Sequence, residues 1–109
     1  MAAHTDEEIA RIRAELGWRE PVFPEGVTLV QTCSACPEQY DAFFDDRLIG
    51  YLRLRHGWFY AAYPDVSGEA VYGTETKGDG CFDMTERADH LEAAVKALVL
   101  ADIEARRPI

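Results

Sequence analysis

The sequence predicts an α+β fold in two layers: an N-terminal helix, an antiparallel sheet of three to five strands, and a long C-terminal helix packed on one face. Three features of the chain support this prediction. Residues 45–63 have the pattern of a hairpin, residues 27–32 and 38–44 are β-rich, and residues 83–107 repeat apolar side chains at helical spacing. At 109 residues the chain is expected to form one domain, residues 1–109, around a single core.

The N-terminal helix is predicted to begin at a capping box, Thr-Asp-Glu-Glu, at residues 5–8. The Thr5 hydroxyl can bond the backbone amide three residues further on, while the Glu8 side chain reaches back toward Thr5. Gly17 suits the left-handed residue that ends a helix. The apolar residues at helical spacing form a narrow stripe, made of Ile9, Ile12 and Leu16.

The segment WREPVFPEG, residues 18–26, joins this helix to the first β-rich run. Its two prolines and its glycine interrupt regular structure. We therefore expect an extended connector within the domain, with Trp18, Val22 and Phe23 packed over the edge of the sheet.

Residues 45–63 are predicted to form the central hairpin, because His56 and Gly57 make a two-residue link and glycine tolerates the positive φ that a tight turn needs. Side chains alternate across a strand, so one face is apolar and the other carries aromatic and guanidinium groups. The expected pairs are Arg55 with Trp58, Arg53 with Tyr60, Tyr51 with Ala62, Leu54 with Phe59, and Leu52 with Ala61.

The strand of residues 38–44 is predicted to reach the hairpin through a three-residue turn at residues 45–47. That register puts its apolar side chains on the core side, whereas a two-residue turn would put Gln39 and Asp41 there. We prefer the first register, in which Gln39 and Asp41 lie on the outer face and compensate part of the positive charge of the arginines there. The apolar side chains concerned are Tyr40, Ala42 and Phe44.

Residues 64–80 are rich in Gly, Pro, Asp and Ser, which predicts a loop with at most one weak edge strand near residues 70–72. The last helix is predicted to begin at a second capping signal, residues 83–86, and to end before Pro108. The positions that follow the helical period are Leu91, Ala94, Val95, Leu98 and Ala101 or Asp102. We expect the helices to cover one face of the sheet and to leave the other face wet.

Most of the net charge of −9 lies after the hairpin, because residues 65–92 contain eight acidic residues and only two basic ones, Lys77 and Arg87, a net charge of −6. A field of this sign opposes binding to duplex DNA or anionic lipid, where affinity comes from neutralising phosphates. No apolar run approaches the roughly 18 residues of a membrane span, and the N-terminus lacks the features of a signal peptide. We expect a cytoplasmic protein without membrane contact.

Cys33 and Cys36 have the C-x2-C spacing of a zinc knuckle or a redox pair. Zinc needs four ligands, however, and only Cys81 and the three histidines remain to complete a set. The favoured interpretation is two partly buried structural cysteines, with a zinc site or a dithiol pair as alternatives. We expect no cofactor. Three cysteines cannot all pair within one chain, which favours a reducing compartment.

Catalytic motifs are missing from the sequence, which has no nucleophile elbow, no H-E-x-x-H and no phosphate loop. His56 lies in the predicted turn and His90 on the last helix, and both are interpreted as surface residues. The segment DDRLIGYLRLR resembles two strands of the acetyltransferase fold, but the acyl-CoA phosphate loop of that fold is absent. We expect no enzymatic activity.

Three motifs, CPEQYD at residues 36–41, GYLRLRHG at residues 50–57 and GDG at residues 78–80, carry a second resemblance. Together they make residues 33–87 similar to small uncharacterised proteins encoded by phages and actinobacterial prophages. The resemblance implies a small acidic protein that acts by stoichiometric binding, as an inhibitor of host nucleases or as a sequestering agent.

Two binding hypotheses follow. In the first, the chain inhibits a host defence or nucleic-acid-handling complex by direct protein binding, in an anti-CRISPR-like or anti-restriction-like manner, with acidic residues in a basic groove. The candidate acidic residues are Glu75, Asp79, Asp83 and Glu86. In the second, the outer face of the hairpin sequesters a small ligand or nucleotide by stacking and by guanidinium contacts. Its candidate residues are Tyr51, Arg53, Arg55, Trp58 and Tyr60.

Each hypothesis has a structural alternative. Acidic loops are usually solvated, and pairs of arginine with an aromatic side chain across two strands stabilise a sheet by about 0.5–1 kcal/mol. A homodimer that buries the outer face would use the same hairpin residues and leave no empty site.

Overall fold

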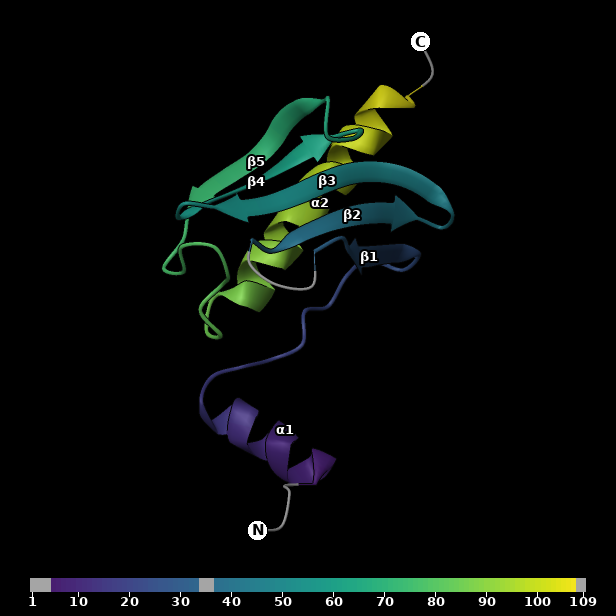
Figure 1. The fold of residues 1–109 in the computed structure, drawn as a ribbon. Helices are drawn as coiled ribbons and strands as arrows, with labels where there is room; N and C mark the ends of the chain where they lie inside the picture. Colours follow the sequence, from purple (N-terminus) through teal and green to yellow (C-terminus); the bar gives the residue numbers. More distant parts are fainter. Residues whose placement is uncertain (1–4, 34–36, 108–109) are drawn as a thin grey trace.

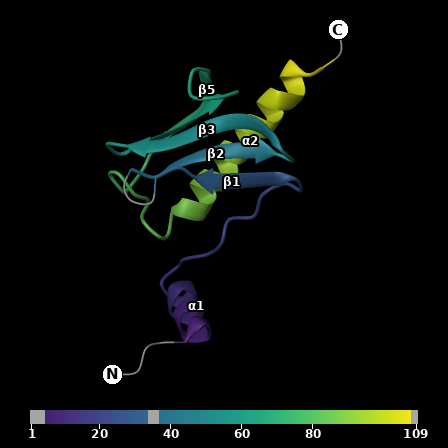
Figure 2. The ribbon, with the colours of Figure 1, turned by 45° about the vertical axis from the view of Figure 1, so that its right-hand side comes forward.

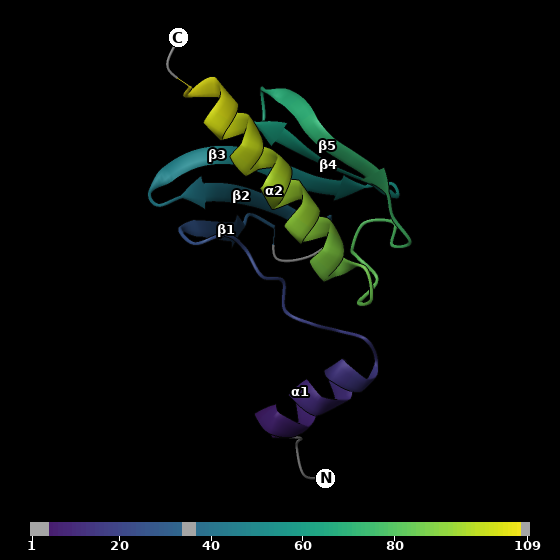
Figure 3. The same ribbon diagram turned by 180° about the vertical axis from the view of Figure 1, so that it is seen from behind.

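The computed structural model describes residues 5–33 and 37–107 and confirms the two-layer α+β architecture. The elements are α1 (Asp6–Glu15), β1 (Val27–Gln31), β2 (Gln39–Phe44), β3 (Arg47–Arg55), β4 (Trp58–Tyr63), β5 (Glu69–Glu75) and α2 (Arg87–Ala105). The strands form one antiparallel sheet in the order β1-β2-β3-β4-β5. Figure 1 shows the sheet in front of α2, and Figure 3 shows α2 lying diagonally across the opposite face.

The β3–β4 hairpin forms as predicted, with all five expected pairs. His56 and Gly57 have φ of 53° and 74°, the two positive values that a type I′ turn requires. The turn also contacts the loop after β5, because the Gly57 N–H donates to the Asp79 carbonyl at 2.8 Å and the Thr76 N–H donates to the Gly57 carbonyl at 2.9 Å. The hairpin tip is therefore fixed from a second segment of the chain.

The predicted three-residue turn between β2 and β3 is wrong. Asp45 and Asp46 alone make the turn, because Phe44 pairs with Arg47. A β-bulge at Ile49 then shifts the register by one residue. The bulge compensates for the shorter turn, so the apolar residues of β2 still face the core as predicted.

The segment after β4 also differs from the prediction, because β5 is a full edge strand of seven residues instead of a loop. Its sequence is polar and contains Gly73, so the strand pattern is weak. Pairing with β4 and the contact of Tyr72 with Phe59, at 6.1 Å between ring centroids, explain why the strand forms.

The last helix starts four residues later than expected, at Arg87. The Asp83 carboxylate instead accepts a hydrogen bond from the Thr85 N–H at 2.9 Å within a preceding turn.

The core lies between α2 and the inner face of β3 and β4. Phe59 is fully buried and meets Phe82 edge to face, with ring centroids 4.9 Å apart. Gly50 allows a close approach of the helix, because a Cβ atom there would lie within 3.0 Å of three Leu98 side-chain carbons. The largest fully buried side chains are Phe59, Ile49, Leu52, Leu54, Leu91, Leu98 and Val95.

Two buried carboxylates fix the ends of α2 against the sheet. Asp102 accepts two hydrogen bonds from Arg47, at 2.8 and 2.9 Å, and one from the Tyr63 hydroxyl at 2.9 Å. The Arg47 hydrogen bonds hold the pKa of Asp102 below its usual value. At the other end Glu38 accepts from the Phe82 N–H at 3.0 Å and from the Tyr40 hydroxyl. Burial, and then the Glu38 contact, raise the pKa of Tyr40 to about 12.

α1 lies away from the rest of the molecule (Figures 1 and 2), although its predicted capping box is confirmed by a 3.2 Å bond from the Glu8 N–H to Thr5 Oγ1. No residue of α1 is buried. The expectation that both helices cover the sheet is therefore wrong, because α2 alone does so. Of the connector residues, Phe23 packs against the core while Val22 is 76% exposed.

We predict that Leu54→Ala destabilises the domain by about 2–5 kcal/mol, because it removes fully buried volume between β3 and α2. Leu48→Ala is the matched control in the same strand, since Leu48 is 39% exposed on the outer face. Chemical denaturation of both variants measures the difference. Equal losses of stability would show that the assignment of core and outer face is wrong.

Candidate functional site

The outer face of the sheet, opposite α2, is the candidate binding surface. In the described residues 5–33 and 37–107, α2 packs on the other face and α1 points away, so neither helix covers it (Figures 1 and 2). The five hairpin residues proposed from the sequence all lie on this face, opposite the buried positions of β3 and β4: Tyr51, Arg53, Arg55, Trp58 and Tyr60.

An aromatic row crosses this face. The Tyr51 and Tyr60 rings are tilted against each other with centroids 6.2 Å apart, and the Tyr51 hydroxyl donates to Gln39 Oε1 at 3.2 Å. Trp58 is 48% exposed and lies against β5, since a Cβ atom at Gly73 would be 2.6 Å from Trp58 Cζ2. Because Gly73 has no side chain, the indole ring of Trp58 can lie over β5 on the surface.

A cationic hollow of about 380 Å³ adjoins the aromatic row at the tip of the hairpin. Arg53 and Arg55 come from β3 and His56 from the turn, while Asp79 belongs to the loop that the turn contacts. The hairpin alternation brings the arginines together, and the backbone contacts of the tip bring the loop to them. The lining residues are Pro37, Arg53, Arg55, His56, Asp79 and Gly80.

Arg53 has an unusual environment within this surface. Its Nε atom is buried and has no hydrogen-bond partner in the described part of the chain. A buried N–H group without a partner costs about 1–3 kcal/mol, so native proteins contain few of them and they often mark functional positions. Among the outer-face residues, Arg53 therefore has the strongest structural reason to be considered part of a binding site.

The four acidic candidates do not form one surface. Glu75 is exposed and pairs with Trp58 across the strands, and Asp79 lines the cationic hollow. Asp83 is exposed, but its carboxylate accepts hydrogen bonds from Thr85, which lower its pKa. Glu86 is only 7% exposed, so its carboxylate serves the fold instead of a partner.

The Glu86 carboxylate organises the loop before α2. It accepts hydrogen bonds from the N–H groups of Lys77 at 2.8 Å and of Gly78 and Asp83 at 2.9 Å, and it lies 3.3 Å from His90 Nε2. Burial acts to raise the pKa of Glu86, but the three N–H donors and His90 together lower it. The capping signal in the sequence predicted that Glu86 lies near the start of the last helix, but it did not indicate that the carboxylate is buried.

Three apolar residues of the same face were not predicted from the sequence. Val30 is 48% exposed on β1, Leu48 is 39% exposed on β3, and Phe43 pairs with Leu48 on the outer side of β2. Alternation along β2 from Asp41 could have predicted that Phe43 lies on the outer face. The outward position of Leu48 depends on the bulge, which has no clear sequence signal. The outer face is thus broader and more apolar than the hairpin alone indicates.

The cysteines do not form a metal centre in the part of the chain that the structure describes, where no three metal-ligating side chains come together. Cys33 is a free, half-buried thiol, and Cys81 is disulfide-bonded, so its sulfur is not a thiolate ligand. Cys36 lies outside the described residues. The disulfide at Cys81 is contrary to the expectation of a reducing compartment, and the cytoplasmic location stays a prediction.

We predict that Glu86→Gln weakens the fold at neutral pH by about 1–3 kcal/mol, because the amide replaces a charged acceptor of three N–H groups. The folded-state pKa of Glu86 lies below its usual 4.5. The stability it contributes is therefore complete above that value and is lost as the pH falls through the folded-state pKa.

The measurement is the difference in unfolding free energy between wild type and Glu86→Gln, followed from pH 7 into acid. The difference should shrink below pH 4.5, where the unfolded-state carboxylate binds its proton. Glu104→Gln is the control, because Glu104 is exposed and only 3.6 Å from Arg107 in a surface pair. A difference that stays constant with pH would contradict the proposed role of the charge.

We also predict that the protein binds no stoichiometric zinc, because the C-x2-C spacing at residues 33–36 is only half of a four-ligand motif and the Cys81 sulfur is disulfide-bonded. Metal analysis of the purified chain tests this. About one zinc per chain that disappears in the Cys33→Ser, Cys36→Ser double variant would refute it.

In the described ranges, no helix combines the length and apolar character needed to cross a membrane. The comparison with known proteins identified no relative: no family model, no curated protein and no solved structure matches this chain. The resemblance to phage proteins stays a prediction.

Proposed function

We propose that this chain is a non-enzymatic binding protein that captures another protein on the outer face of its sheet. The observation that carries the proposal is the uncovered face itself, where the aromatic row lies beside a hollow lined by Arg53 and Arg55. Tryptophan, tyrosine and arginine are the residues that dominate protein interfaces energetically, and here all three types share one exposed surface.

The breadth of the surface favours a protein over a small ligand. Exposed apolar side chains lie on three strands of this face, with Val30 on β1, Leu48 on β3 and Trp58 on β4. Small-ligand sites are concave and enclose most of the ligand. A broad sheet face that combines exposed apolar side chains with a cationic hollow near one end matches a protein partner that inserts a carboxylate beside Arg53 and Arg55.

The partner class that we propose is a protein of a host defence or nucleic-acid-handling complex, which the chain would inhibit by occupying its surface. The exposed acids Glu69, Glu75 and Asp79 lie on or just after the edge strand β5, next to the outer face. They would steer encounter with a basic partner of this kind. Charge mimicry over the whole stretch 65–92 is not part of the proposal, since Glu86 is buried and Arg19 pairs with Asp89 and Glu92.

A second candidate function is sequestration of a nucleotide. It is favoured by the cationic hollow, in which Arg53, Arg55 and His56 would face phosphate, and by the exposed Trp58 ring, which would stack on a base. Its distinguishing property is that the purified chain would bind nucleotides without any protein partner.

We predict that Arg53→Ala and Trp58→Ala each lower partner binding at least about tenfold while they cost less than about 1.5 kcal/mol of stability. The immobilised chain is exposed to host lysate, retained proteins are identified, and the affinity of the recovered partner is measured for each variant. Thr28→Ala is the control, because Thr28 is exposed on the distal strand β1 and carries no charge or ring.

Two outcomes would count against the proposal. If Arg53→Ala and Trp58→Ala destabilise the fold as severely as Leu54→Ala, the outer face is buried in the functional state, under a helix or a second subunit. If the variants bind the recovered partner as well as wild type does, the partner uses another surface. Thermal stabilisation of the wild type by nucleotides, lost in Arg53→Ala, would favour the second candidate function instead.

A further inference from the structure

α1 is a helical arm that approaches the rest of the described chain at its C-terminal end, where Arg13 lines a hollow with Met84 and Arg87. It has ten residues and none is buried, although Ile9, Ile12 and Leu16 form an apolar stripe and are 36%, 40% and 58% exposed. Isolated helices shorter than about 12–15 residues are marginal in water, so a helix of this length usually needs a packing partner. The molecule is 62 Å long, and its radius of gyration of 15.3 Å exceeds the about 13 Å of a compact chain of this size.

The direction of the arm is fixed by its C-terminal cap. Gly17 has φ of 91°, and the N–H groups of Gly17 and Trp18 donate to the carbonyls of Ala14 at 3.1 Å and Arg13 at 2.8 Å, the pattern of a Schellman motif. The Arg13 guanidinium also lies 5.2 Å from the centre of the Trp18 ring. These contacts hold α1 against Trp18, and the next residue, Arg19, is tied to Asp89 and Glu92 of α2.

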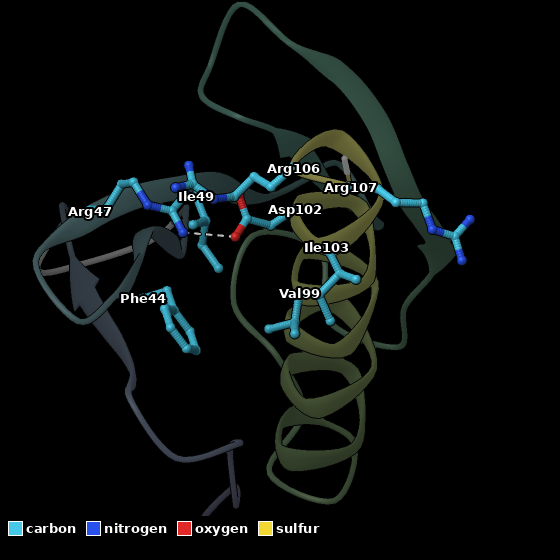
Figure 4. A pocket seen from close by; sticks show the side chains of 8 residues that line it. All are labelled: Phe44, Arg47, Ile49, Val99, Asp102, Ile103, Arg106 and Arg107. Carbon is cyan, nitrogen blue, oxygen red and sulfur yellow. Dashed lines mark hydrogen bonds and ion pairs between the residues drawn. The ribbon is translucent and has the colours of Figure 1, made fainter. Parts of the chain in front are cut away.

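In the part of the chain that the structure describes, a groove without a partner lies at the opposite end of the molecule, between α2 and the β2–β3 turn. It has a volume of about 450 Å³, with apolar walls formed by Phe44, Ile49, Val99 and Ile103. Figure 4 shows Phe44 and Val99 on its two sides, with Arg47 and Arg106 at one end and Arg107 directed away on the far side of α2. Ile103 is 59% exposed, so apolar surface is left open here.

Arm and groove have complementary chemistry. α1 carries four acids against two arginines, a net charge of −2, and Glu15 flanks the apolar stripe on the helix surface. The groove combines apolar walls with the guanidinium of Arg106, while Arg47 is already paired with Asp102. An acidic amphipathic helix is the kind of ligand that an apolar groove with a cationic end accepts.

The arm lies far from the groove of its own chain (Figures 1 and 2). Arg19, two residues after Gly17, is held by Asp89 and Glu92 near the start of α2, whereas the groove lies along the last turns of that helix. From Glu92 to Ile103 the helix rises about 16 Å, at about 1.5 Å per residue, and the cap turns α1 the other way. With these contacts in place, the groove that is open to the arm is that of a second molecule.

We propose that α1 is an exchange arm, which docks its apolar stripe in the groove between α2 and the β2–β3 turn of a second copy of this chain. The arm of the second copy docks in the groove of the first, so the two molecules form a two-fold symmetric dimer with two identical arm–groove contacts. The outer face of the sheet takes no part in this contact, and the proposal does not rest on the proposed function.

The test measures the mass of the full chain in solution by sedimentation over a concentration series. Wild type should show a monomer–dimer equilibrium. Ile12→Asp in the arm and Ile103→Lys in the groove should each weaken dimerisation at least about tenfold, because each places a charge in an apolar contact. The controls are Ala14→Asp, on the opposite side of α1, and Leu100→Lys, at a 54% exposed position of α2 outside the groove; both should dimerise like wild type.

Mixing the two defective variants gives the sharper result. A chain with Ile12→Asp keeps an intact groove and one with Ile103→Lys keeps an intact arm, so together they form one complete contact. The mixture should contain more dimer than either variant alone. A wild type that stays monomeric, a dimer that survives both substitutions, or a mixture no more dimeric than its components would overturn the proposal.

Discussion

The packing of Leu98 against Gly50 sets how closely α2 approaches the sheet. A side chain on residue 50 would occupy the space that the leucine fills, so the helix could not lie at this distance from β3. Close packing of this kind gains dispersion contacts that a looser arrangement loses. It lies in a core where Leu52 and Leu54 of β3 and Phe59 and Ala61 of β4 are fully buried, and the rest of the molecule is arranged around that contact.

Charged groups near both ends of α2 then set its diagonal course. Asp102 is bonded to Arg47 at the start of β3, and Arg87 at the first turn contacts the buried Glu38 and the Tyr40 hydroxyl. Buried carboxylates are costly unless they are paired, so these contacts favour one position of the helix over its alternatives. As a result α2 packs mainly on β3, β4 and β5, and a groove remains beside β2.

One long helix on a five-stranded sheet leaves two kinds of surface uncovered. The whole outer face is open, with its aromatic row and arginines, and so is the groove beside α2. The first is broad and suits another protein, whereas the second is narrow and suits a helix. Because they lie on opposite faces of the sheet, a dimer built through the groove would leave both outer faces free for binding.

The sequence by itself determined the local features of this protein: the capping box at Thr5, the hairpin at His56 and Gly57, and the outward position of Arg53 and Trp58. These depend on residues close together in the chain, whose spacing and backbone preferences are visible in the sequence. Only the tertiary structure decided the bulge at Ile49, the existence of β5, the burial of Glu86 and the separation of α1, because each depends on which distant segments lie beside it. A polar edge strand forms when a neighbour supplies its hydrogen bonds, and a carboxylate is buried when a loop supplies its donors.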